Sequence, residues 1–261
     1  MRIAVLGLGE AGSIYAADLT RRGAIVTGTD PRVSAPPPGV AMTRGIADAV
    51  AGADLVLSLV GAGAAASVLA EASPAIGPGA IYADMNTSAP ADKRTLAVAA
   101  AGQGIDFADV AILAPVPRAR IDTPLLLSGA AAERLAPLLA GLGIPTTGVG
   151  AEAGAAAQLK LLRSVFMKGL AAVVYESVEA AEVVGAREWV LGQIEAEFGE
   201  DGPEIVHHLL AGTAKHAVRR EAEMRDVRDL LESLGSPHPM TDGTIEWFQR
   251  ILRAERDSVV E

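Results

Sequence analysis

The sequence of 261 residues contains no cysteine. A disulfide, a thiolate metal site and a cysteine nucleophile are therefore all excluded. Aromatic residues make up only 3% of the chain, so the hydrophobic core must consist mainly of Ala, Val, Leu and Ile side chains. Lysine is also scarce, with four residues against eighteen arginines. The positions of these few lysines are therefore informative.

The chain also lacks an excess of positive charge and long apolar runs. Its net charge of −10 argues against a nucleic-acid partner, which requires a basic surface, but still permits a small anionic ligand held by a few local cations. The opening "MRIAVLGLGE" is too short and too glycine-rich for a signal peptide, and no apolar stretch is long enough to span a membrane. We expect a cytoplasmic protein with no membrane partner.

The first 150 residues alternate short apolar runs with helical patterns. The predicted strands are Ile3–Leu6, Ala24–Thr29, Leu55–Val60, Ala80–Asp84, Phe107–Ile112 and Leu125–Ser128. The predicted helices between them are Ala11–Arg22, Ala64–Ala72, Ala91–Ala101 and Ala131–Leu142. This alternation predicts an α/β fold of the doubly wound Rossmann type, with a mostly parallel sheet that carries helices on both faces.

The pattern changes after residue 150. From there only helical periodicity remains, and the predicted helices are Ala153–Val184, Arg187–Phe198, Pro203–Ser233 and Thr241–Arg256. We therefore predict two domains, a Rossmann domain over residues 1–150 and a smaller all-α domain over residues 151–261. The long helix that begins at Ala153 would join them.

A glycine-rich turn, Gly7-x-Gly9-x-x-Gly12, follows the first predicted strand and opens the first predicted helix. A dinucleotide fingerprint needs glycine for the tight turn, for backbone approach to the pyrophosphate and for close packing of helix on strand. The helix N-terminus then offers N–H groups to the phosphates. A plain strand-to-helix turn is the alternative. The predicted cofactor contacts here are Gly7, Leu8, Gly9, Glu10, Ala11 and Gly12.

Two further segments are predicted to contact the cofactor. Asp30 ends the second strand, where a carboxylate accepts hydrogen bonds from the adenosine ribose hydroxyls and repels a 2′-phosphate. This favours NAD, although Arg32 nearby leaves NADP open, and Asp30 has the alternative of a loop acid before a proline. Val60 and Gly61 follow the strand Leu55–Val60 at the carboxyl edge of the sheet, and the alternative for them is a simple turn.

Two loops are candidates for substrate binding. Asn86, Thr87 and Ser88 follow the strand Ala80–Asp84 and suit a carboxylate or hydroxyl ligand, while an N-cap for the next helix is the alternative. The second loop, Ala111–Arg120, is stiffened by prolines, and either Arg118 or Arg120 has the reach to bind an anion, although a solvated loop arginine is the simpler interpretation. No metal site is predicted.

Half of the lysines lie in the segment "GAAAQLKLLRSVFMKGLAA", residues 154–172. Lys160, Ser164 and Lys168 recur at intervals of four and share one helix face, with Arg163 beside them. A lysine amine can lose its proton when desolvated, whereas an arginine cannot, so lysine suits a general acid or base. The alternative for Lys160 is an ordinary lysine at the surface.

Together these segments resemble the β-hydroxyacid dehydrogenase superfamily, which includes 6-phosphogluconate and 3-hydroxyisobutyrate dehydrogenases. "GLGEAG" resembles its cofactor fingerprint, and "DMNTSAP" is similar to its substrate motif D-x-S-T-x-x-P, with Asn86 where Ser is usual. "GAAAQLK" resembles the segment that carries the catalytic lysine. The resemblance implies that Lys160 is the general acid or base and that Asn86 and Thr87 orient the substrate.

The resemblance also shows departures. Arg163 and Ser164 stand where the family has a substrate-binding Asn, so both are predicted to contact the substrate, and Arg163 would add positive charge for a carboxylate, phosphate or phosphonate. Pro117, Arg118 and Ala119 replace small residues of the family's A-P-V-S-G-G loop. "KLLRSVFMKGL" and "GTAKHAVRREAEM" resemble a narrower branch with a compact helical C-terminal domain. The resemblance implies substrate contacts from His216 and Arg219, a site between the domains and a homodimer, although a polar helix face is the alternative for that pair.

The sequence therefore predicts an NAD(P)-dependent oxidoreductase that acts on a small hydroxy acid, phosphorylated or not, or on its keto form. Activity on 6-phosphogluconate itself is not expected, because the family's true 6-phosphogluconate dehydrogenases have a much larger helical domain. One alternative is an imine reductase of the same architecture, against which the presence of Lys160 counts. A protein that senses the dinucleotide without turnover is the other.

Overall fold

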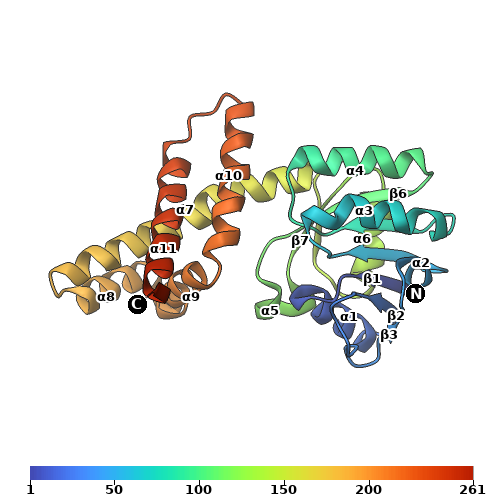
Figure 1. Cartoon of the computed structure of the whole chain (residues 1–261), viewed down its shortest axis with the longest axis horizontal. Coiled ribbons are helices and arrows are strands. Elements are labelled where there is room, and N and C mark those ends of the chain that lie inside the picture. The colour runs from blue at the N-terminus through green and yellow to red at the C-terminus, as the bar shows by residue number, and fades with distance from the viewer. Residues whose placement is uncertain (261) are drawn as a thin grey trace. The chain divides into compact units, whose positions relative to one another are not determined.

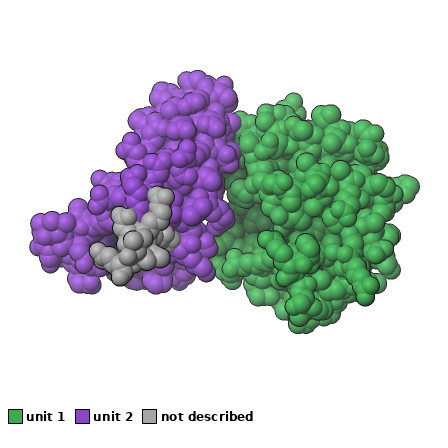
Figure 2. All heavy atoms as spheres, in the orientation of Figure 1, with its two compact units in different colours: residues 1–160 green, residues 161–261 purple. Residues whose placement is uncertain are grey.

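The computed structural model describes residues 1–260, with the side chains of residues 1–213 and 215–254. The chain forms two compact units, Met1–Lys160 and Leu161–Glu261, which are coloured separately in Figure 2. Helix α7 (Ala155–Val183) contains the boundary between them. Each unit is described by itself below.

Unit 1 is built on one eight-stranded sheet with the order β3-β2-β1-β4-β5-β6-β7-β8 (Figure 1). Neighbouring strands run parallel, except that β7 is antiparallel to β6. The strands are β1 Arg2–Leu6, β2 Ile25–Thr29, β3 Ala41–Met42, β4 Leu55–Ser58, β5 Ile81–Asp84, β6 Asp106–Ile112, β7 Leu125–Ser128 and β8 Thr146–Gly148. The strand order reverses between β1 and β4, which is where doubly wound sheets bind their ligands.

Helices cover both faces of this sheet, as the doubly wound prediction requires. On one face α1 and α6 pack through Tyr15, Leu19, Leu135 and Leu139. On the other face α2, α3 and α4 contribute Ala49, Leu69 and Leu96. The helices of unit 1 are α1 Glu10–Arg21, α2 Ile46–Val50, α3 Ala62–Ala72, α4 Pro90–Gly102, α5 Val116–Ala119 and α6 Ala132–Gly141. The predicted fold class is confirmed.

Unit 2 is entirely helical over its described residues, and α7 runs through it. Its other helices are α8 Arg187–Glu197, α9 Gly202–Lys215, α10 Ala217–Ser233 and α11 Pro239–Val260. One core joins α7, α10 and α11 around Leu161, Met224 and Phe248. A second core joins α7 and α9 around Val174 and Val206.

The prediction of one helix over Pro203–Ser233 is wrong, because the chain forms α9 and α10 with a break at His216. The backbone of His216 leaves the helical region with φ −122° and ψ 22°. Arg220 donates a hydrogen bond across the break to Thr213 Oγ1 at 2.6 Å. Gly212 leaves room for this guanidinium, since a Cβ there would lie 2.8 Å from Arg220 Nη2.

Among the strands and α-helices, four short ones were not predicted: β3, α2, α5 and β8. None of them exceeds five residues, so none shows the periodicity on which prediction depends. In the part of the chain that the structure describes, no helix has both the length and the hydropathy needed to cross a bilayer.

Candidate functional site

The glycine turn between β1 and α1 has the geometry that a dinucleotide fingerprint requires. Gly7 has φ +89°, a region that favours glycine, and a Cβ on it would lie 2.6 Å from Leu59 O. A Cβ on Gly12 would lie 1.9 Å from Gly7 O, so this position also excludes any side chain. These two contacts hold the start of α1 tightly against the ends of β1 and β4.

Gly9 differs from the other two glycines because a Cβ on it would meet no protein atom within 4 Å. Gly9 is the N-cap of α1 and has no side chain of its own to satisfy the free N–H groups there. The open space and the helix N-terminus fit a pyrophosphate. Glu10 is exposed beside this space, while Leu8 and Ala11 pack into the core below. Of the predicted contacts in the turn, Leu8 and Ala11 therefore offer only their backbone.

Asp30 lies directly below the turn and is buried. Its carboxylate accepts hydrogen bonds from the backbone N–H of Leu8 at 2.9 Å and of Arg32 at 2.8 Å. The Arg32 guanidinium is exposed and lies 3.7 Å from the same carboxylate. Asp30 is therefore tied to the glycine turn, and its two oxygens retain further acceptor capacity.

Gly61 and Asn86 connect the ends of β4 and β5. Gly61 has φ +91°, and its N–H donates to Asn86 Oδ1 at 2.7 Å. The Asn86 amide donates in turn to Ser58 Oγ at 3.1 Å and to Asp84 Oδ1. The Asn86 side chain thus links the end of β4 and the following loop to the end of β5, next to the glycine turn. Its predicted contact with substrate stays a prediction.

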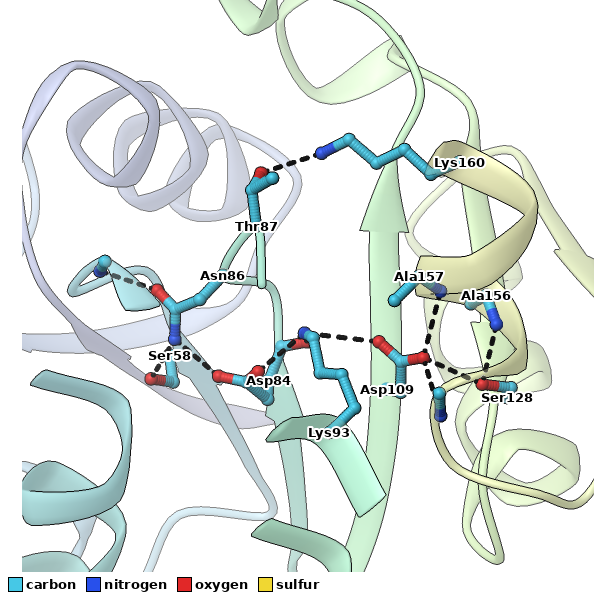
Figure 3. Close-up of polar contacts among 12 residues, drawn as sticks. Ser58, Asp84, Asn86, Thr87, Lys93, Asp109, Ser128, Ala156, Ala157 and Lys160 are labelled. Carbon is cyan, nitrogen blue, oxygen red and sulfur yellow. Dashed lines mark hydrogen bonds and ion pairs between the residues drawn. The ribbon is translucent and has the colours of Figure 1, made fainter. Parts of the chain in front are cut away.

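Thr87 and Lys160 meet at this edge of the sheet. Lys160 Nζ donates a hydrogen bond to Thr87 Oγ1 at 2.8 Å, and Thr87 is exposed (Figure 3). Ser88 is buried, and its hydroxyl has no hydrogen-bond partner among the described residues. The alternative that this loop caps α4 is wrong, because Ala89 is the N-cap and no side chain caps the helix.

A row of buried polar side chains crosses the sheet behind this loop, and the sequence prediction missed it. The register places Ser58 of β4 beside Asp84 of β5, Asp84 beside Asp109 of β6, and Asp109 beside Ser128 of β7. All four residues are fully buried. A local signal was available for each residue, because Ser58, Asp84 and Ser128 end apolar strands and Asp109 lies inside a mostly apolar one.

Lys93 reaches into the middle of this row from α4. Its Nζ lies 2.6 Å from Asp84 Oδ2 and 3.2 Å from Asp109 Oδ1, and it donates to Asp84 O at 2.9 Å (Figure 3). The Lys93 side chain is only 1% exposed. Unit 1 therefore contains a buried lysine, Lys93, for which the sequence predicted no role.

The same row holds the beginning of α7. Asp109 Oδ2 accepts hydrogen bonds from the N–H groups of Gly154 at 3.1 Å and Ala157 at 3.2 Å. Ser128 Oγ accepts one from the N–H of Ala156 at 3.0 Å and donates one to Asp109 Oδ2 at 3.0 Å. Two strand side chains thus satisfy the free N–H groups of this helix N-terminus, where an anion is electrostatically favoured.

In unit 2, Lys168 and Ser164 of α7 meet Glu223 of α10. Glu223 Oε1 accepts from Ser164 Oγ at 2.6 Å and lies 2.7 Å from Lys168 Nζ. Burial lowers the pKa of the Lys168 ammonium, the Glu223 carboxylate opposes this shift, and Arg220 and Arg219 add to it. The lysine whose pKa is lowered here is Lys168, whose role the sequence leaves open between a charge that supports the site and a structural charge.

The remaining predicted substrate residues belong to both units. Arg118 is exposed on α5, Arg163 and Arg219 are exposed in unit 2, and His216 lies at the break before α10. Arg120, the other arginine of the predicted loop, is not directed to a ligand, since it forms an ion pair with the buried Asp18 at 2.6 Å. The roles of Arg118, Arg163, His216 and Arg219 stay predictions. The described side chains include no group of three or more His, Asp or Glu residues placed to hold a metal ion.

Comparison with known protein families shows to which superfamily the chain belongs. Residues 2–150 match the family described as the NAD binding domain of 6-phosphogluconate dehydrogenase. The chain belongs to the 6-phosphogluconate dehydrogenase-like superfamily of β-hydroxyacid dehydrogenases. Residues 181–251 match a second family, described only as a domain of unknown function (DUF1932).

Three relatives illustrate the range of this superfamily. A conserved hypothetical protein from Sinorhizobium meliloti 1021 is 32% identical, with a TM-score of 0.74, over 95% of this chain and 87% of that one. An uncharacterized 28.5 kDa protein of Methanothermus fervidus is 27% identical over 96% of this chain and 99% of its own length. The 3-hydroxyisobutyrate dehydrogenase of Mycobacterium tuberculosis shares the fold, with a TM-score of 0.77 at 21% identity over 95% of this chain and 92% of that one.

This membership establishes the general class of the protein. The protein has the fold and the cofactor domain of an oxidoreductase that uses a nicotinamide dinucleotide.

Proposed function

We propose that this protein is an NAD-dependent oxidoreductase that transfers a hydride between the nicotinamide and a small hydroxy acid or its keto form. One observation carries the proposal: Lys160 Nζ lies 2.8 Å from a hydroxyl, that of Thr87, at the edge of the sheet that also holds the glycine turn. An amine at this position has the reach to contact a substrate hydroxyl.

The fit of the cofactor rests on Gly9, Gly12 and Asp30. Gly9 leaves open space at the N-terminus of α1, and Asp30 lies where it can accept hydrogen bonds from ribose hydroxyls. When bound, a nicotinamide dinucleotide supplies the acceptor or donor of the hydride. The buried Asp30 carboxylate would repel a 2′-phosphate, which supports NAD over NADP.

The proposed proton transfer belongs to Lys160. During oxidation the neutral Lys160 amine accepts the proton of the substrate hydroxyl while the carbinol carbon loses hydride, and the carbonyl double bond forms. During reduction the Lys160 ammonium returns the proton to the carbonyl oxygen. Thr87 and Ser88 would orient the substrate, and the partnerless buried hydroxyl of Ser88 supports a polar ligand at this point.

A pair of glycine substitutions tests the cofactor site. Gly9→Ala introduces a methyl group into space that is open in the protein, so the fold should persist while binding of NADH falls, on the order of 10-fold or more. Gly102→Ala at the end of α4 is the matched control, because a Cβ there also meets nothing within 4 Å and the residue lies away from the predicted cofactor contacts. Fluorescence titration of both variants with NADH and NADPH measures binding and cofactor preference. Equal NADH binding by wild type and Gly9→Ala would contradict the site.

Absorbance at 340 nm tests turnover itself. We expect a signal when the protein is screened with NAD and small hydroxy acids, or with NADH and the corresponding keto acids. A signal with cyclic imines alone would instead identify an imine reductase. Silence in every panel, together with tight NADH binding, would identify a dinucleotide sensor and overturn the proposed function.

A further inference from the structure

Lys93 occupies an unusual position for a lysine. It is the fourth residue of α4, where the helix dipole disfavours a cation, and it is nearly inaccessible to water. Burial of an ion pair costs desolvation that its attraction does not always recover, so apolar residues in place of the whole cluster of Lys93, Asp84 and Asp109 would cost no stability. A role in geometry explains the lysine better than a role in stability.

The two carboxylates that contact Lys93 lead to the two halves of the proposed catalytic pair. Asp84 accepts from the Asn86 amide, and Asn86 immediately precedes Thr87. Asp109 accepts from the N–H groups at the start of α7, and Lys160 follows Ala157 by one helical turn on the same face. One ammonium therefore lies between the loop that carries Thr87 and the helix that carries Lys160 (Figure 3).

We propose that Lys93 is a positioning residue that sets the distance between Lys160 and Thr87. It does so by holding Asp84 and Asp109 to a single amine, which fixes the Thr87 loop and the N-terminus of α7 relative to one another. The proposal rests on the proposed function only in calling Lys160 catalytic. The positioning itself is a property of unit 1 and is measurable without a substrate.

Close packing leaves this arrangement little freedom. A Cβ on Gly154, at the start of α7, would lie 2.6 Å from Pro90 O at the start of α4. The two helix N-termini thus touch through backbone, and Lys93 and Asp109 join them through side chains. Without the ammonium, the facing Asp84 and Asp109 carboxylates repel each other, and their separation carries the attached loop and helix apart.

The test uses the scarcity of lysine. Protein labelled with ¹³C at lysine Cε gives one methylene signal each for Lys93, Lys160, Lys168 and Lys215, which single Lys→Arg variants assign. The two Hε protons of Lys160 should be inequivalent in the wild type, because the side chain is held. Thr87→Val removes this acceptor and gives the reference signal of Lys160 without its Thr87 contact.

We expect Lys93→Met to move the Lys160 signal to the Thr87→Val position. Leu69→Ala is the control, since it destabilises unit 1 from the buried side of α3 without touching the polar row, and it should leave the signal unchanged. If Lys93→Met fails to fold, Ser128→Ala replaces it, because Ser128 contacts both Asp109 and Ala156. That variant should shift the signal in the same direction by less.

Three results would overturn the positioning role. These are a wild-type Lys160 signal that already matches Thr87→Val, an unchanged Lys160 signal in folded Lys93→Met, or an equal shift in Leu69→Ala.

Kinetics then separate this inference from the proposed function. With a hydroxy acid found in the screen, Lys93→Met should lower kcat on the order of 10²-fold with little change in KM, and add nothing in the Lys160→Met background. If Lys93→Met shifts the Lys160 signal but the wild type turns over no substrate in the screen, the proposed function is wrong and the positioning role stands. Turnover with an additive effect of the two substitutions would overturn the positioning role alone.

Discussion

Each unit holds a lysine against a carboxylate, fully buried in unit 1 and half-buried in unit 2, but the charges that surround the two amines are opposite. Lys93 in unit 1 lies between two acids, Asp84 and Asp109. Lys168 in unit 2 has one acid, Glu223, and feels the positive charge of Arg220 and Arg219. Negative charges therefore predominate around the Lys93 amine, and positive charges predominate around the Lys168 amine.

The Lys93 ammonium holds two carboxylates together. The positive charge of Lys168 is instead disfavoured by burial and by two nearby arginines. Removal of the Lys93 ammonium leaves two buried carboxylates facing each other. Removal of the Lys168 ammonium leaves Glu223 with the Ser164 hydroxyl and the attraction of a neighbouring arginine. Substitutions at the two positions should therefore differ in size, and three predictions follow from the comparison.

Lys93→Met should have the largest effect, a loss of about 3–5 kcal/mol in the free energy of unfolding, because a buried pair is broken on one side only. Urea denaturation measures it. Addition of Asp109→Asn to Lys93→Met should recover part of the loss, since one uncompensated charge disappears. A loss below about 1 kcal/mol for Lys93→Met would show that water or rearrangement relieves the two carboxylates.

Lys168→Met should cost less, about 1–2 kcal/mol, because it removes the hydrogen bonds of Lys168 to Glu223 and Ser164 but leaves Glu223 with other partners. The same urea titration, run side by side with Lys93→Met, gives the ratio of the two losses. A larger loss at position 168 than at position 93 would reverse the comparison.

The pH dependence should be smaller still and specific to Lys168. Its folded pKa lies below the unfolded value of 10.5, so between those two values the unfolded chain binds a proton that the folded protein does not. The free energy of unfolding should therefore gain a rising contribution as the pH passes through this window. The difference between wild type and Lys168→Met, measured from pH 7.5 to 10, isolates it. A contribution that falls with pH would mean that Glu223 outweighs burial.

The sequence was sufficient for the fold class because strands such as Ile3–Leu6 and Leu125–Ser128 are apolar runs bounded by turn residues, and helices alternate with them. It was insufficient where an element is too short to show a repeating hydrophobic pattern, as in the two-residue β3, or where tertiary contacts decide where a helix ends. The break at His216 is of the second kind, since it depends on Arg220 reaching Thr213 across seven residues.

The candidate site was partly predictable for a similar reason. The glycine turn, Asp30 and Lys160 are adjacent to local signals, namely a strand end or a helix face. The row Ser58–Asp84–Asp109–Ser128 is formed by strand register, which joins residues up to 70 positions apart and is visible only in the folded sheet. Lys93 received no role because its partners belong to that row.

Hydride transfer by Lys160→Met, with NADH binding measured in the same preparation, tests the central claim most directly. If Lys160 carries the proton, this variant should bind NADH as the wild type does and lose about 10²–10⁴-fold in kcat with a hydroxy acid or keto acid. Near-normal turnover by Lys160→Met with bound cofactor would contradict the account.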